Sequence, residues 1–219
     1  GDVYKRQVIR NGEQLLLALV IPIGIVVAGR FLGSRVGLTM DVLAPSVLAL
    51  AIWSTCFTSQ AIMTGFERRY GVLERLSATP LGRSGLLAGK AMAYSVISLA
   101  QVILLVIVSL TLGWRPHGSA LAWLPSLVSV ILAMLAFGLA ALAMAGSLKA
   151  EVTLGLANLV YIVGLVAGAV VWPLADYPKA TRPVVAALPT AALGESLRAW
   201  GVGQPLWLSL IHISEPTRP

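Results

Sequence analysis

Two short segments of the chain come close to catalytic motifs. Residues 84–91 read SGLLAGKA, a near match to the phosphate-binding loop of ATPases. That loop needs Gly where Ser84 stands and Ser or Thr where Ala91 stands, and it follows a strand, not a helix as expected here. Residues 82–85 spell the G-x-S-G of intramembrane serine proteases, whose nucleophile needs a base beside it. The candidate base, His117, lies beyond a long apolar run, so the sequence indicates neither activity.

The sequence also offers few residues for metal binding or thiol chemistry. The chain has one cysteine and two histidines, and one of these, His212, lies in a terminal segment that we expect not to be native. A single Cys56 and a single His117 are too few for a metal site or a Cys/His nucleophile pair. We therefore expect no metal, no cofactor and no enzymatic activity in this chain, and we interpret Cys56 as a small apolar filler.

The composition is that of a membrane protein. Of the 219 residues, 58% are hydrophobic and only 11% are charged, whereas soluble domains carry about 25% charged residues. The net charge of +7 comes from Lys and Arg scattered between apolar runs, as membrane topology requires. We expect contact with membrane lipid and no binding of nucleic acid.

The two ends of the chain match a translated sequencing-library adapter. Residues 1–7 read GDVYKRQ and residues 208–219 read LSLIHISEPTRP, which correspond to one transposon end read in opposite orientations. We expect both segments to be adapter-derived and not native. The native part is then residues 8–207, a single transmembrane domain truncated at both ends.

Long apolar stretches predict an all-α, polytopic helical membrane protein. A helix needs about 20 apolar residues to cross the hydrocarbon core. Five stretches meet this need, at about 15–31, 42–65, 91–113, 121–147 and 152–172. Residues 173–200 carry too many charges and prolines to span, but 189–200 could form an amphipathic helix at the membrane interface. We expect a sixth span beyond residue 207.

The positive charges favour a cytoplasmic N-terminus. With that orientation the inner loops hold seven Lys and Arg and the outer loops hold six. Five of the seven lie in residues 66–90, and density near helix ends is what sets orientation. We therefore predict that residues 66–90 form a cytoplasmic loop.

This loop reads FERRYGVLERLSATPLGRSGLLAGK and predicts a short amphipathic helix. Its apolar face and its charged positions follow helical spacing, and it ends near Thr79 and Pro80. The apolar residues are Val72, Leu73 and Leu76, and the charged residues are Glu67, Arg68, Glu74 and Arg75. Such a helix can lie on the membrane or dock a partner, although a merely solvated loop is the common meaning of this charge pattern.

The same loop resembles one in a known family. The pattern E-R-x-x-G-x-L-E-x-L-x-x-T-P, followed by G-K, is similar to the loop after the second span in permeases of type-2 ABC exporters, the drug-efflux and polysaccharide or O-antigen export family. It is carried by Glu67, Arg68, Gly71, Leu73, Glu74, Leu76, Thr79, Pro80, Gly89 and Lys90. Two further matches are R-N-x-x-Q at Arg10, Asn11 and Gln14, and L-P with S-L-R at Leu188, Pro189, Ser196, Leu197 and Arg198.

The resemblance implies a function and partners. The chain would be the permease of an exporter in a bacterial inner membrane, working as a homodimer or heterodimer. It would move a drug, lipid or saccharide, driven by a separate ATP-binding-cassette ATPase. The loop would be a coupling helix that docks this ATPase through Glu67, Arg68, Val72, Leu73, Glu74, Arg75, Leu76, Thr79 and Pro80.

Polar residues inside the spans suggest a translocation path. The candidates are Gln60, Gln101, Asn158 and Tyr161. Polar groups in a bilayer face other helices or a water-filled route, and helix packing is the commoner role for any single residue.

Two other function classes remain open. A secondary transporter would need an ionisable residue inside a span, and spans two to five hold none in their interiors. A membrane scaffold could use residues 66–90 only to dock a partner. A neighbouring gene for a P-loop ATPase would favour the exporter over both.

Overall fold

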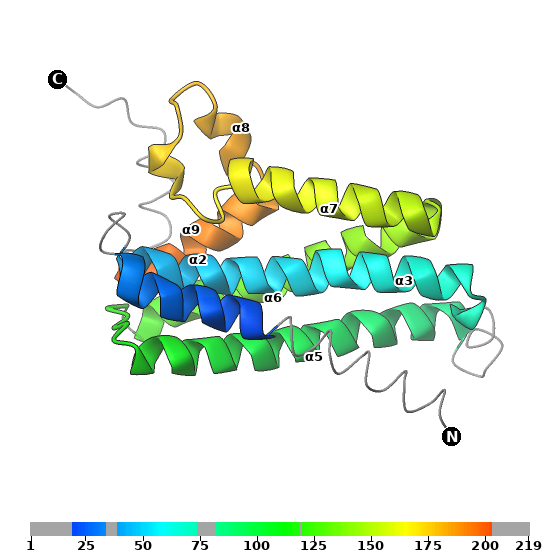
Figure 1. Cartoon of the computed structure of the whole chain (residues 1–219), viewed down its shortest axis with the longest axis horizontal. Coiled ribbons are helices and arrows are strands. Elements are labelled where there is room, and N and C mark those ends of the chain that lie inside the picture. Colours follow the sequence, from blue (N-terminus) through cyan, green and yellow to red (C-terminus); the bar gives the residue numbers. More distant parts are fainter. Residues whose placement is uncertain (1–18, 34–38, 74–81, 119, 203–219) are drawn as a thin grey trace.

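A computed structural model describes residues 19–33, 39–73, 82–118 and 120–202, without the side chains of 83 and 120–123. Every regular element in these ranges is a helix (Figure 1). The predicted adapter segments, most of the amphipathic loop helix and the start of the first predicted span lie outside the described residues. The all-α prediction is confirmed.

Among the described residues, four helices are long and apolar enough to cross a membrane: Met40–Arg69, Ser84–Thr111, Leu124–Ser147 and Ala150–Ala167. A shorter apolar helix, Leu19–Leu32, occupies the described part of the first predicted span. At 1.5 Å per residue, the shortest of the four covers about 27 Å, close to the hydrocarbon thickness. The chain is therefore a multi-pass membrane protein, and the number of five complete spans stays a prediction.

The first long helix is a central rod made of three consecutive segments. These are α2 (Met40–Trp53), the π-helical η2 (Ser54–Ser59) and α3 (Gln60–Arg69). In its most apolar window 67% of the residues are buried, against 17% in the span of α5 (Gly82–Thr111). The rod is therefore surrounded by the other helices, which leave their own outer faces to lipid (Figure 1).

The two halves of the rod have different neighbours. The first half, α2, packs chiefly against α5 and α9 (Pro189–Val202), whereas the second half, α3, packs against α6 (Ala120–Ser147) and α7 (Ala150–Ala167). Between them η2 adds a π-helical register that the apolar pattern did not predict. Such segments are rare and often lie at functional positions.

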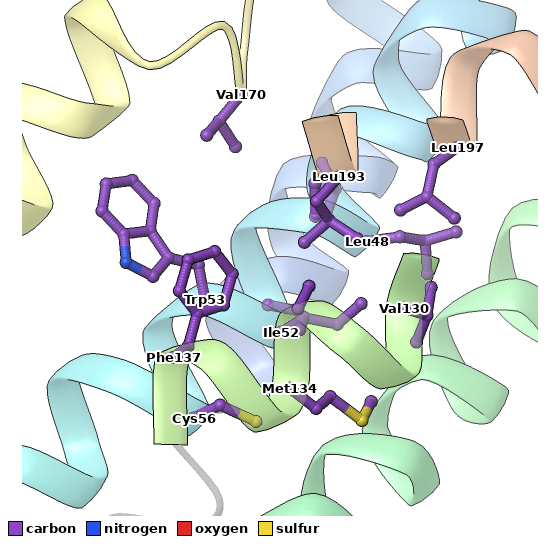
Figure 2. Packing of buried hydrophobic residues seen from close by; sticks show 14 of the residues in the cluster. Leu48, Ile52, Trp53, Cys56, Val130, Met134, Phe137, Val170, Leu193 and Leu197 are labelled. Carbon is purple, nitrogen blue, oxygen red and sulfur yellow. The ribbon is translucent and has the colours of Figure 1, made fainter. Parts of the chain in front are cut away.

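Aromatic rings fill the core where the rod meets α6 and α7. The ring of Trp53 lies beside that of Phe137, with 6.1 Å between centroids (Figure 2). It also lies 5.6 Å from the ring of Tyr161, between centroids. A side chain at Gly164 would collide with Trp53, so this glycine is explained by packing within one chain. Ile52 and Leu193 continue the same core outward (Figure 2).

Three predicted boundaries are wrong. The second span was expected to end at residue 65, but α3 continues to Arg69. The third span was expected to begin at residue 91, but α5 begins at Gly82, because residues 84–90 are mostly helix formers and Lys90 pairs with Glu67. The fifth span was expected to reach residue 172, but α7 ends at Ala167. Ala169 has a φ of 50°, and this turn directs the chain away from the span.

The helix predicted at 189–200 exists as α9, but it does not lie free at the interface. Most of its residues are buried against α2 and α6, including Leu193, Ser196 and Trp200. Two short helices, η3 (Leu174–Asp176) and α8 (Arg182–Ala186), lead into it. The sequence looks amphipathic because α9 carries small polar residues at packing positions, and these are buried in the assembled bundle.

Candidate functional site

The cytoplasmic end of α3, with the predicted orientation, carries three consecutive charged residues that contact three different helices. Glu67 forms an ion pair with Lys90 of α5. The Arg68 guanidinium donates to backbone carbonyls of Ala145 (3.1 Å) and Gly146 (2.5 Å) at the end of α6. Arg69 forms an ion pair with a glutamate in the first turn of α7. The inner ends of all four helices are thus connected through α3.

The two ion pairs differ in how far their side chains are exposed to solvent. The side chains of Glu67 and Lys90 are 29% and 13% exposed, whereas those of Arg69 and Glu151 are 51% and 58% exposed. Exposed pairs contribute about 0–1 kcal/mol. Arg68 adds charge-assisted hydrogen bonds to carbonyls at a helix C-terminus, where a cation is favourable. The sequence predicted Glu67 and Arg68 to face an ATPase, but in this structure they contact α5 and α6.

A glycine lies at the start of the loop that follows α3. Gly71 has a φ of 67°, a left-handed conformation that glycine adopts without strain, and its N–H donates to the carbonyl of Arg68 (3.1 Å). Beyond it Val72 and Leu73 are helical, with Val72 36% exposed and Leu73 half-buried. The adjacent Tyr70 is 65% exposed. The remaining predicted docking residues, Glu74, Arg75, Leu76, Thr79 and Pro80, lie outside the described residues.

The polar residues predicted for a translocation path lie in different surroundings. Gln101 is 2% exposed and accepts a hydrogen bond from Thr55 (2.8 Å). Gln60 is 1% exposed, and its amide occupies the space left by Gly138, where a Cβ would lie 3.4 Å from Oε1. Both amides are therefore buried within the chain's own bundle.

The other two path candidates lie on α7. Tyr161 is half-buried against Trp53. Asn158 is exposed, and on the same helix Leu159 is 57% and Ile162 is 58% exposed. An amide in the middle of a span is costly to place against lipid, so the position of Asn158 needs a partner or a polar route.

The end of the bundle opposite the α3–α5 loop contains a buried charged cluster, of which the sequence motif included only Arg198. The Arg198 guanidinium donates to Ser46 Oγ (3.0 Å), to the Val170 carbonyl (3.0 Å) and to the Ala169 carbonyl (2.5 Å). It also pairs with Glu195 at 2.7 Å, and Arg198 is only 5% exposed. The cluster joins α9, α2 and the turn after α7. Its sequence signal was the i,i+3 spacing of Glu195 and Arg198.

The two segments that come close to catalytic motifs both lie at the start of α5. Residues 84–91 lie inside α5, so most of their backbone N–H groups are used by the helix, and the segment has no loop that could surround a phosphate. Ser84 lies in the first turn of the 30-residue helix α5, whereas His117 lies in the loop that follows the opposite end of this helix. Within the described ranges, no group of three or more His, Cys, Asp or Glu could hold a metal ion.

Comparison with known families identifies the chain. Residues 4–200 match the family described as ABC-2 type transporter. Searches of curated proteins and of solved structures gave no significant match. The match covers most of the chain and agrees with the helical membrane architecture and with the position of the E-R-x-x-G segment at the end of α3. The chain therefore belongs to the ABC-2 type transporter family of membrane permeases.

Proposed function

We propose that the chain is the permease subunit of an ATP-driven exporter in a bacterial cell membrane, and that it works as a dimer with a separate ATPase. The ATPase docks on the loop after α3, through Val72, Leu73 and the predicted docking residues that follow them in the sequence. The observation that carries the proposal is the apolar side chain of Val72, which is exposed directly after Gly71. Exposed apolar residues at a loop between spans favour a protein contact.

Within this proposal, the exposed face of α7 borders the substrate route or the second permease. Asn158 supports this because its amide lies at mid-helix with apolar neighbours and would otherwise face lipid. The buried Gln60 and Gln101 have a packing role in the single chain. A drug, a lipid or a saccharide remains the proposed class of substrate.

The docking assignment is tested with Val72→Asp in the permease expressed beside the ATPase encoded next to its gene. A carboxylate placed in a buried apolar contact costs on the order of several kcal/mol. Each loss of about 1.4 kcal/mol weakens binding about tenfold. We expect normal membrane insertion with at least a tenfold loss of co-purified ATPase. The matched control is Val184→Asp, since Val184 is 71% exposed in α8 at the other end of the bundle.

A charge reversal provides a second variant of the same loop. Glu74→Lys should also release the ATPase without affecting insertion, because loss of one partner of a buried charged pair costs about 2–5 kcal/mol. If both Val72→Asp and Glu74→Lys retain the ATPase and its turnover as the parent does, the loop is not the docking site.

A further inference from the structure

The cytoplasmic junction has a geometry that only the assembled bundle reveals. Consecutive residues of a helix point about 100° apart, so three in a row can reach three helices packed around a central one. Glu67, Arg68 and Arg69 do this toward α5, α6 and α7 respectively. Only Tyr70 separates them from Gly71, where the coupling loop begins.

These contacts shelter the Glu67–Lys90 pair, whereas Arg68 and Arg69 remain exposed while they contact α6 and α7. Glu67 and Lys90 shelter each other, with side chains 29% and 13% exposed. Arg68 donates to the carbonyls of Ala145 and Gly146. A displacement of the loop after Gly71 must therefore act first on the end of α3, and through these contacts on its three neighbours.

We propose that Glu67, Arg68 and Arg69 are positioning residues that make the inner ends of α5, α6 and α7 move together with α3 when the ATPase closes. This rests on the proposed function, because it needs an ATPase on the coupling loop. The residues act through other helices and do not themselves bind the ATPase. The sheltered Glu67–Lys90 pair is the most testable of the three contacts, since both partners can be exchanged.

The test compares the movement of two helices in the complete permease–ATPase complex. Single cysteines for spin labels replace Tyr70, which reports on α3, or Met92, which is 70% exposed on α5. The native Cys56, which is buried, is replaced by Ala. Label-to-label distances across the dimer are measured with and without ATP and vanadate.

In the parent, both labels should change their distances when ATP and vanadate are added. In Lys90→Glu, the Tyr70 label should still shift, whereas the shift of the Met92 label should fall to less than half. The double variant Glu67→Lys/Lys90→Glu should restore it. The control Lys179→Glu reverses an exposed charge beside the outer helices and should leave both shifts as in the parent.

The outcomes separate this inference from the proposed function. If the Tyr70 label does not move in the parent, the proposed docking fails, and this inference fails with it. If the Tyr70 label moves but Lys90→Glu leaves the Met92 shift unchanged, docking stands and the positioning role is refuted. A loss of ATPase binding in Lys90→Glu, recovered by the exchange, would also refute it, since these charges would then serve docking.

Discussion

The buried guanidinium of Arg198 should be one of the largest single contributors to the stability of the outer bundle. Arg198→Ala removes hydrogen bonds to Ser46 and to the carbonyls of Ala169 and Val170. It also leaves the Glu195 carboxylate, whose side chain is 20% exposed, without its cation. Breaking a buried ion pair by removing one partner costs about 3–5 kcal/mol. We expect Arg198→Ala to lower the free energy of unfolding by this amount.

The Glu195 carboxylate keeps one described partner after this change, the backbone N–H of Leu174 at 2.9 Å. Arg198→Lys keeps the charge, but one ammonium cannot reproduce a planar fork that reaches Ser46, Ala169 and Glu195 together. We expect this variant to lower the free energy of unfolding by about 1–3 kcal/mol, as for buried acceptors left without a hydrogen-bond partner. The double variant Glu195→Ala/Arg198→Ala should cost less than the sum of its single variants, because the two residues interact.

The assay is unfolding of the purified protein in mixed micelles with increasing sodium dodecyl sulfate. Tryptophan fluorescence follows unfolding, and part of this signal comes from α9, because Trp200 of α9 lies 5.3 Å from Trp114 between ring centroids, edge to face. The control Lys179→Ala changes an exposed side chain and should stay within about 0.5 kcal/mol of the parent. An Arg198→Ala variant within about 1 kcal/mol of the parent would refute the reasoning, since surface pairs have that value.

Two further predictions concern the spans, and both are checked by the same unfolding assay. Gly164→Ala should destabilise the protein by about 1–3 kcal/mol, because the added methyl group meets the packed ring of Trp53. Gly155→Ala should be neutral or stabilising by up to about 1 kcal/mol, because that position is open; equal effects would contradict the packing. Gln101→Leu should cost about 1–3 kcal/mol, because Thr55 loses a buried partner. Asn158→Leu should unfold as the parent does, because Asn158 is exposed in the single chain; a loss equal to that of Gln101→Leu would show an unrecognised role in the fold.

The sequence by itself determined the class of the protein. A chain with so few charged residues cannot cover a water-soluble surface, and apolar runs of span length leave helices as the structure that satisfies the backbone in lipid. The residues around Gly71 also indicated the family, because a loop motif is local and can be recognised without knowing its neighbours. The rejection of the 84–91 phosphate loop was likewise local, since it depended on two residues of the wrong type.

The tertiary structure decided which polar residues are available. Helical periodicity predicts that an element forms, but it does not say which helix covers each face. Glu67 and Arg68 looked solvated in a loop until α5 and α6 were placed beside α3. The helix α9 looked peripheral until α2 and α6 covered it.

The same distinction applies to the polar residues of the spans. Gln60, Gln101 and Asn158 are all amides within apolar runs, and their chemistry in the sequence is nearly the same. The bundle buries the two glutamines against Gly138 and Thr55 and leaves the asparagine exposed. Burial is a property of contacts between residues far apart in the chain, and these contacts arise only when the helices pack.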